Sequence, residues 1–232
     1  MALVLATAVN ERARGPGSAG LRRGPQRGRG VLDGVFTATG QPGAQSVQLV
    51  ISDAHEGLKE AIQKVLAGAS SQRCRVHFMR NLLAQVPKAM QPMVAAFVRT
   101  IFAQPDKASA HAQLAAVAAN LSGRFPKAAQ LLLEAEEAIL ASMAFPVEHR
   151  RQLHSTTPLE RVNREIGRRT GVVGISPNAA AVIRLAGAVL QEQHDEWTAA
   201  SRRYFSQESM SKLYTSSGEM LQSVELLAPS HV

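Results

Sequence analysis

Apolar positions recur along this chain in two periods, and the helical period accounts for most of its length. The apolar stretch at residues 1–10 and the compact run at residues 46–51 have the composition of strands. A short unbroken apolar run is typical of a strand that is covered on both faces. Apolar side chains at helical spacing then predict a helix from about residue 58 to a stop near Gly68. We therefore expect a small amount of strand followed by a long helical region.

Beyond Cys74 the pattern stays helical, and prolines and capping residues mark the expected helix boundaries. A loop around Pro146 and the glycine-containing run at residues 170–174 are expected to interrupt the helices. Ser176 as N-cap, with Pro177 after it, predicts the start of the last long helix. The expected helical segments are residues 77–86, 90–101, 105–121, 126–140, 159–166 and 176–197, and residues 214–232 are expected to fray.

The chain of 232 residues has a formal net charge of +8, and two short stretches carry it. Residues 11–30 hold six arginines, six glycines, two prolines and one glutamate. Leu21 is the one large apolar side chain among them, so burial cannot offset the entropy of ordering this backbone, and we expect residues 11–45 to be disordered. Residues 150–169 hold six arginines and two glutamates. Such clusters of positive charge favour a polyanionic partner.

Carboxylates in two places are candidates for metal binding. Asp53 follows an apolar strand, where a carboxylate can project into a crevice and hold Mg²⁺; the alternative is that it caps the following helix. Glu160 and Glu165 lie on a short helix together with Arg161, Arg164, Arg168 and Arg169. In one interpretation, this helix carries a metal-binding acid beside a basic face that contacts phosphates. In the other, it has a solvated face of ion pairs, such as Glu160 with Arg164.

Cys74 and His77 have the spacing of half a zinc site. A closed structural zinc site needs four ligands, and Cys74 is the one cysteine of the chain, so we expect a small buried thiol near a hydrogen-bonded histidine, and no zinc. A single cysteine also excludes an intramolecular disulfide and favours a reducing, cytoplasmic setting. No apolar run approaches the ~20 residues of a membrane span, so no membrane partner is expected.

Several segments, taken in order, resemble the Mutator-type family of insertion-sequence transposases. They are VISDAHEGL at residues 50–58, CRVHFMRN at residues 74–81 and TTPLERVNREIGRRTGVVGI at residues 156–175. The match continues through IRLAGAVLQEQ at residues 183–193 and on to residues 197–204. The resemblance covers residues 2–10 and about 46–213, and this combination of segments is specific to the family.

The resemblance implies an α/β fold, mostly helical in this chain: an incomplete RNase-H-like catalytic core, with residues 46–72 and 151–213 on either side of an all-helical insertion domain at residues 73–150. It implies DNA strand cleavage and transfer that depend on Mg²⁺ or Mn²⁺, with element ends and target DNA as partners, in a homo-oligomer associated with the nucleoid. Asp53 would be the second acid and Glu160 the third, both binding metal, with Glu165 the alternative third acid. Cys74 and His77 would be structural. Arg161, Arg164, Arg168 and Arg169 would contact DNA or brace the site.

The chain also departs from the family pattern. The first acid of the family lies on a strand that would precede residue 1, so it is absent from this sequence, as is the N-terminal DNA-recognition region. Residues 11–45 do not resemble the family segment expected there, which two compensating frameshifts would explain; an evolved Arg/Gly nucleic-acid tail is the alternative. We therefore expect an inactive transposase fragment. The other hypothesis is a non-enzymatic remnant that binds DNA or intact transposase subunits.

Overall fold

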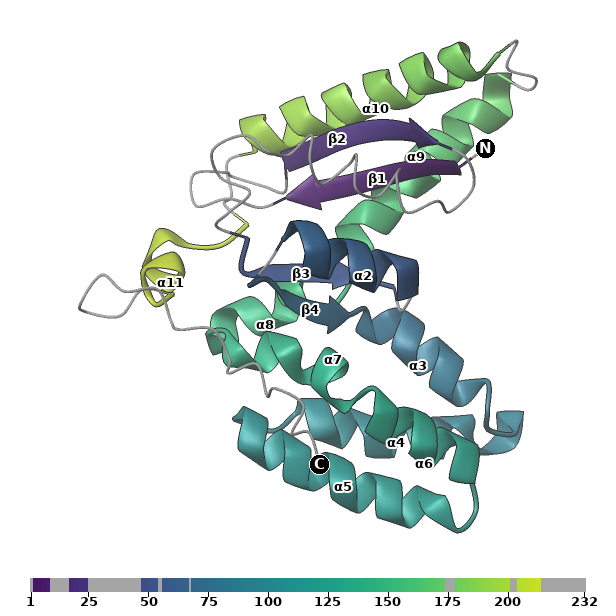
Figure 1. Cartoon of the computed structure of the whole chain (residues 1–232), viewed down its shortest axis with the longest axis vertical. Helices are drawn as coiled ribbons and strands as arrows, with labels where there is room; N and C mark the ends of the chain where they lie inside the picture. The colour runs from purple at the N-terminus through teal and green to yellow at the C-terminus, as the bar shows by residue number, and fades with distance from the viewer. Residues whose placement is uncertain are drawn as a thin grey trace.

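The computed structural model describes residues 2–8, 17–24, 47–53, 56–66, 68–173, 178–200 and 204–213. They form three layers along the long axis of the molecule: a strand pair under two long helices, a small strand–helix–strand unit, and a block of helices (Figure 1). The predicted class, α/β with mostly helix, is confirmed. None of the helices in these residues is both long and apolar enough to cross a membrane.

The first layer contains strand β1 (Ala2–Ala8), as predicted, and strand β2 (Gly17–Gly24), which was not predicted. The strands are antiparallel, with Ala2 opposite Gly24 and Ala8 opposite Gly17. Our expectation of disorder is therefore wrong for residues 17–24. That expectation was based on the small number of apolar side chains within the segment. Strand pairing uses backbone N–H and C=O groups, which glycine and arginine also have. Residues 11–16 and 25–45 lie outside the described residues.

The second layer is a βαβ unit that ends at the candidate site. Strand β3 (Leu49–Ser52) leads through helix α2 (Glu56–Val65) to strand β4 (Ser70–Arg73), which lies parallel to β3. The predicted strand and helix are confirmed, and Gly68 after the helix has a φ of +95°, a conformation that favours glycine. Strand β4 was not predicted because its sequence, SSQR, contains no apolar residue.

The third layer is helical throughout and holds the larger hydrophobic core. The fully buried Phe78, Leu82, Leu114 and Leu132 pack together in its centre. Asp106 caps one helix through a 2.8 Å hydrogen bond from Ser109 N, as the sequence indicated. The elements are α3 (Arg75–Leu83), η2 (Lys88–Met90), α4 (Gln91–Phe102), α5 (Lys107–Ser122), α6 (Pro126–Glu134), α7 (Glu136–Leu140), η3 (Ala141–Ala144) and α8 (Val147–Leu153).

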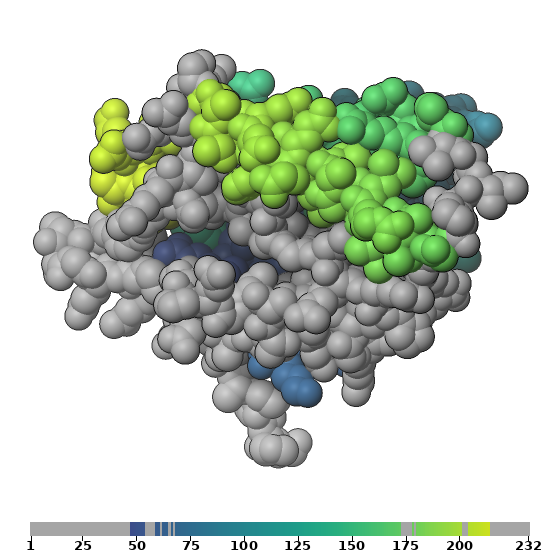
Figure 2. Space-filling model, turned by 90° about the horizontal axis from the view of Figure 1, so that it is seen from above, coloured from purple at the N-terminus to yellow at the C-terminus, as the bar shows by residue number. Residues whose placement is uncertain are grey.

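Helices α9 (Thr157–Val173) and α10 (Ala179–Ala199) pack on each other and on the β1–β2 pair. Val162 and Ile166 of α9 form a second, smaller core with Val189 and neighbouring residues of α10. Seen from above, α10 crosses the top of the molecule with its outer face uncovered (Figure 2). A short helix, α11 (Gln207–Ser211), follows.

Two boundary predictions for these helices are wrong. The run at residues 170–173 continues α9 instead of breaking it. A glycine inside a helix costs only about 1 kcal/mol, which packing against α10 can offset. The N-cap of α10 is Asn178, whose Oδ1 accepts a 2.9 Å hydrogen bond from Ala181 N, and the predicted cap at Ser176 lies outside the described residues. Residues 214–232, expected to fray, also lie outside them.

Candidate metal centre

Parallel pairing of β3 and β4 brings the first two site residues to one sheet edge. Asp53 follows β3, and Cys74 follows β4 at the same edge. The backbone N–H of Cys74 donates to the Ser52 carbonyl at 2.9 Å, so the peptide link beside Asp53 also fixes Cys74. The Asp53 side chain is 59% exposed, whereas Cys74 is fully buried. Cys74 is therefore enclosed by the fold, whereas the Asp53 carboxylate reaches the solvent.

His77, on the first turn of α3, lies between two carboxylates. Its Nδ1 atom is 2.7 Å from Asp53 Oδ1, and its Nε2 atom is 3.6 Å from Glu160 Oε1. The buried Nδ1 makes no aligned hydrogen bond despite the short contact with Asp53, so we treat that contact as electrostatic. Asp53 and Glu160 are 107 residues apart in the chain, yet they lie at the two nitrogen atoms of the same imidazole ring. The fold therefore brings these two acids to one place.

Thr156, just before α9, joins the two halves of the site. Its backbone N–H and its hydroxyl lie 3.4 Å and 3.3 Å from Cys74 Sγ, which accepts hydrogen bonds from them. The same hydroxyl is 3.2 Å from Glu160 Oε1, so its single proton serves either the sulfur or the carboxylate at any time. Sequence reasoning did not single out Thr156. The available signal was its place at a helix start, where threonine is favoured as a cap.

Donor atoms of three types gather around this point. One ligand atom each from Asp53, Cys74 and His77 lies within 4.8 Å of the other two. Carboxylates suit hard cations such as Mg²⁺ and Mn²⁺, whereas a thiolate and an imidazole suit softer ions. The buried Nδ1 of His77, which has no hydrogen-bond partner among the described residues, also fits a site that a cation would complete. The residues present can therefore hold a divalent metal ion.

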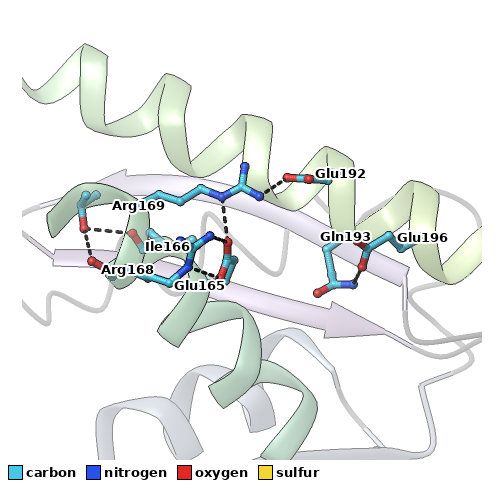
Figure 3. A network of polar contacts seen from close by, with 9 residues as sticks. Glu165, Ile166, Arg168, Arg169, Glu192, Gln193 and Glu196 are labelled. Atoms are coloured by element: carbon cyan, nitrogen blue, oxygen red, sulfur yellow. Dashed lines mark hydrogen bonds and ion pairs between the residues drawn. The ribbon is translucent and has the colours of Figure 1, made fainter. Parts of the chain in front are cut away.

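Glu165, the alternative third acid, is engaged elsewhere (Figure 3). It accepts hydrogen bonds from Arg168 at 2.7 and 3.0 Å and from Arg169 at 2.8 Å. These bonds, those from Arg168 first, lower the pKa of the Glu165 carboxyl from 4.5 to about 2. Arg169 also reaches Glu192 of α10 at 2.6 Å, so the cluster links α9 to α10. The ion-pair interpretation therefore describes this end of the helix.

The other two arginines of α9 are placed differently. Arg161 and Arg164 are exposed, and the described part of the chain offers neither of them a hydrogen bond or an ion pair. Within the described residues, Glu160 and Arg164 do not form the ion pair that we considered. Glu160 faces His77 and Thr156 instead. Both side chains are thus exposed and without a partner among the described residues.

A family model described as "Transposase, Mutator family" matches residues 21–200, which is most of the chain and includes every residue of this site. The chain belongs to the Mutator family of transposases. The matched span begins inside the segment 11–45 that we interpreted as foreign to the family, and it does not include residues 2–10. The frameshift interpretation stays a prediction.

Relatives named as transposases of insertion sequences agree with this assignment. The chain is 46% identical, over 73% of its length, to the transposase for insertion sequence element IS1081 of Mycobacterium tuberculosis. It is 39% identical over 69% of its length to the transposase for element ISRM5 of Rhizobium meliloti, and 38% identical over 70% to that for IS256 in transposon Tn4001 of Staphylococcus aureus. The matched parts are 41%, 40% and 42% of those relatives, so the chain spans about two fifths of their length.

Proposed function

We propose that this chain carries the second and third acidic positions of an RNase-H-like transposase core that cleaves and joins DNA. The convergence of Asp53 and Glu160 on His77 is the observation that carries the proposal. Asp53 follows a strand and Glu160 starts a helix, so each is held by regular structure on one side of the site. The relatives are named as transposases of insertion sequences, which supports the same reaction class.

Asp53 and Glu160 would hold Mg²⁺ or Mn²⁺ through their carboxylates. When bound, such ions activate an attacking oxygen and stabilise the leaving oxygen of a phosphodiester. His77 now occupies the space between the two carboxylates, so its ring must shift for them to share one ion. Thr156 would then hold the Glu160 carboxylate in place by donating its hydroxyl proton. Glu165 is not assigned to this role because Arg168 and Arg169 already occupy its oxygens.

DNA binding would rest on the exposed part of α9. Arg161 and Arg164 follow Glu160 on the same helix and carry no counter-charge within the described residues. Arginine contacts with phosphates position a nucleic acid without reading its sequence. Arg168 and Arg169 would instead brace α9 against α10. Exposed arginines that are separate from the acids also support the alternative function, a chain that binds DNA without cutting it.

Manganese titration tests the assignment of the acids. Loss of the free Mn²⁺ signal in electron paramagnetic resonance reports binding to the purified chain. Because a carboxylate ligand contributes charge as well as a bond, Asp53→Asn and Glu160→Gln should each weaken binding about tenfold or more. Glu165→Gln, on the same helix and equal in charge change, is the matched control and should bind as the parent chain does. Equal weakening by Glu160→Gln and Glu165→Gln would refute the assignment.

A plasmid assay tests activity. Two carboxylates from one side of a two-metal site cannot fix both the attacking and the leaving oxygen. We therefore expect the isolated 232-residue chain to leave supercoiled plasmid intact with either Mg²⁺ or Mn²⁺. Metal-dependent nicking that disappears in Asp53→Ala would show that the chain completes the site by itself, and would overturn the expectation of an inactive chain.

A further inference from the structure

We propose that Asp53, Cys74 and His77 form a binding site for a borderline-soft divalent ion of the Zn²⁺ class. Their ligand atoms lie within 4.8 Å of one another. Zinc binds thiolate, imidazole and carboxylate at about 2.0 to 2.3 Å, which places neighbouring ligand atoms roughly 3 to 4 Å apart. A small rotation of side chains therefore brings the three atoms around one ion. The inference does not depend on the chain acting on DNA.

The backbone already orients these donors. Cys74 and His77 are separated by three residues at the start of α3, so their side chains share one face of the helix. Cys74 N is hydrogen-bonded to Ser52 O, which places the sulfur beside the strand end that carries Asp53. The exposed Asp53 carboxylate can turn toward an ion without disturbing a core contact. The buried Cys74 and the partly buried His77 would set the position, and the exposed Asp53 carboxylate would complete it.

Residues around the three ligands also fit a metal centre. Metal-binding histidines usually have a carboxylate near the second ring nitrogen, which fixes the tautomer. Here Nδ1 faces Asp53 and lacks a hydrogen bond, while Nε2 faces the Glu160 carboxylate at 3.6 Å. Thr156 donates to the sulfur, as outer ligands of metal-bound thiolates do. Three protein ligands would leave a fourth position of a tetrahedral ion open to solvent.

The donor set separates this site from a magnesium site. A thiolate and an imidazole add affinity for Zn²⁺ and Co²⁺, but little for Mg²⁺, which prefers oxygen. Asp53 belongs to both donor sets, so a Zn²⁺ ion bound through Cys74 and His77 would withdraw it from Glu160. The sequence argument against zinc counted only the cysteine–histidine pair, whereas the fold supplies Asp53 as a third ligand. We expect Zn²⁺ to compete with Mn²⁺ for the chain.

Cobalt substitution tests the site. Co²⁺ added to the purified, reduced chain should give a sulfur-to-cobalt charge-transfer band in the near ultraviolet, together with visible bands of a tetrahedral ion. One equivalent of Zn²⁺ should abolish them, and Mg²⁺ at the same concentration should not. Cys74→Ser should lose the charge-transfer band. His77→Gln and Asp53→Asn should weaken Co²⁺ binding about tenfold or more, because each removes one of three protein ligands.

The matched control is His111→Gln. His111 Nδ1 also contacts a carboxylate, Glu136 Oε1 at 2.5 Å, but no sulfur lies in that cluster of the described chain. This variant should bind Co²⁺ like the parent chain. Because Cys74 is buried, circular dichroism must show that Cys74→Ser is folded; if it is not, the partly exposed His77→Gln decides the outcome.

The proposal is overturned if the parent chain gives no charge-transfer band, if folded Cys74→Ser retains it, or if His77→Gln and His111→Gln bind alike. None of these readouts involves DNA or Glu160. Failure of the cobalt experiment would therefore not refute the proposed transposase function. Conversely, if the manganese titration showed that Glu160 is not needed, the cobalt result would still hold.

Discussion

Replacement of Gln72 by methionine should strongly destabilise the chain, because this buried amide links β4 to the helical block. Gln72 is fully buried, and its Nε2 donates to the Ile139 carbonyl at 3.1 Å while its Oε1 accepts from Ser142 N at 2.7 Å. Methionine matches the length of the side chain but leaves both backbone groups without this partner. A buried polar group left unpaired costs about 1 to 3 kcal/mol, so two such groups should cost about 2 to 6 kcal/mol.

Urea unfolding, followed by circular dichroism, measures this effect. A loss of about 2 to 6 kcal/mol is a large part of the total stability of an ordinary domain, which is about 5 to 15 kcal/mol. With a slope of about 2 kcal/mol per molar urea, the midpoint should fall by about 1 to 3 M. Gln130→Met is the matched control. Within the described residues the exposed Gln130 bonds the side chain of Glu134 alone, so its loss should cost less than about 0.5 kcal/mol. Equal midpoints for the two variants would refute this account of Gln72.

Two further predictions concern DNA binding and pH. Replacing both Arg161 and Arg164 with glutamine should reduce the slope of log DNA affinity against log salt concentration by about 2. The same change at Arg168 and Arg169 should alter this slope less, because both are already paired with a carboxylate. Equal changes in a filter-binding or anisotropy titration would contradict the assignment of DNA contacts to Arg161 and Arg164 alone. Burial lowers the pKa of His149 from its usual 6.5, so just below pH 6.5 the unfolded chain binds more protons than the folded chain. Stability should therefore fall as the pH falls through that range. His149→Gln should flatten this part of the plot of urea midpoint against pH, and an unchanged slope would count against this role of His149.

The sequence predicted the elements whose apolar pattern is strong. The helices of the block and strand β3 were expected because their buried residues recur at a regular spacing. Strands β2 and β4 were not expected, because their stability comes from backbone pairing with β1 and β3, and a local pattern of side chains carries no record of a distant partner. The N-cap of α10 was misplaced by two residues because serine and asparagine are equally good caps.

The candidate site was predicted in its members but not in its geometry. Asp53, Cys74, His77 and Glu160 could be named from motif positions, and the resemblance to the family implied a metal-binding role for the two acids and a structural role for Cys74 and His77. Spacing along the chain could not show that His77 lies between the carboxylates, that Thr156 joins sulfur to carboxylate, or that Arg168 and Arg169 are already paired. Each of these contacts joins residues whose side-chain orientation depends on packing, which a single sequence does not contain.

Helix α3 explains how the packing of the helical block can govern the site of the two acids. Cys74 at the N-cap of α3 and His77 in its first turn lie beside the carboxylates, while Phe78 and Leu82 of the same helix are fully buried in the core of the block. A helix fixed on one side by close packing moves as a unit, because cores of this density tolerate little rearrangement. The position of His77 between Asp53 and Glu160 is therefore set by the packing of residues that touch neither acid. Substitutions in that core should change metal affinity as well as stability.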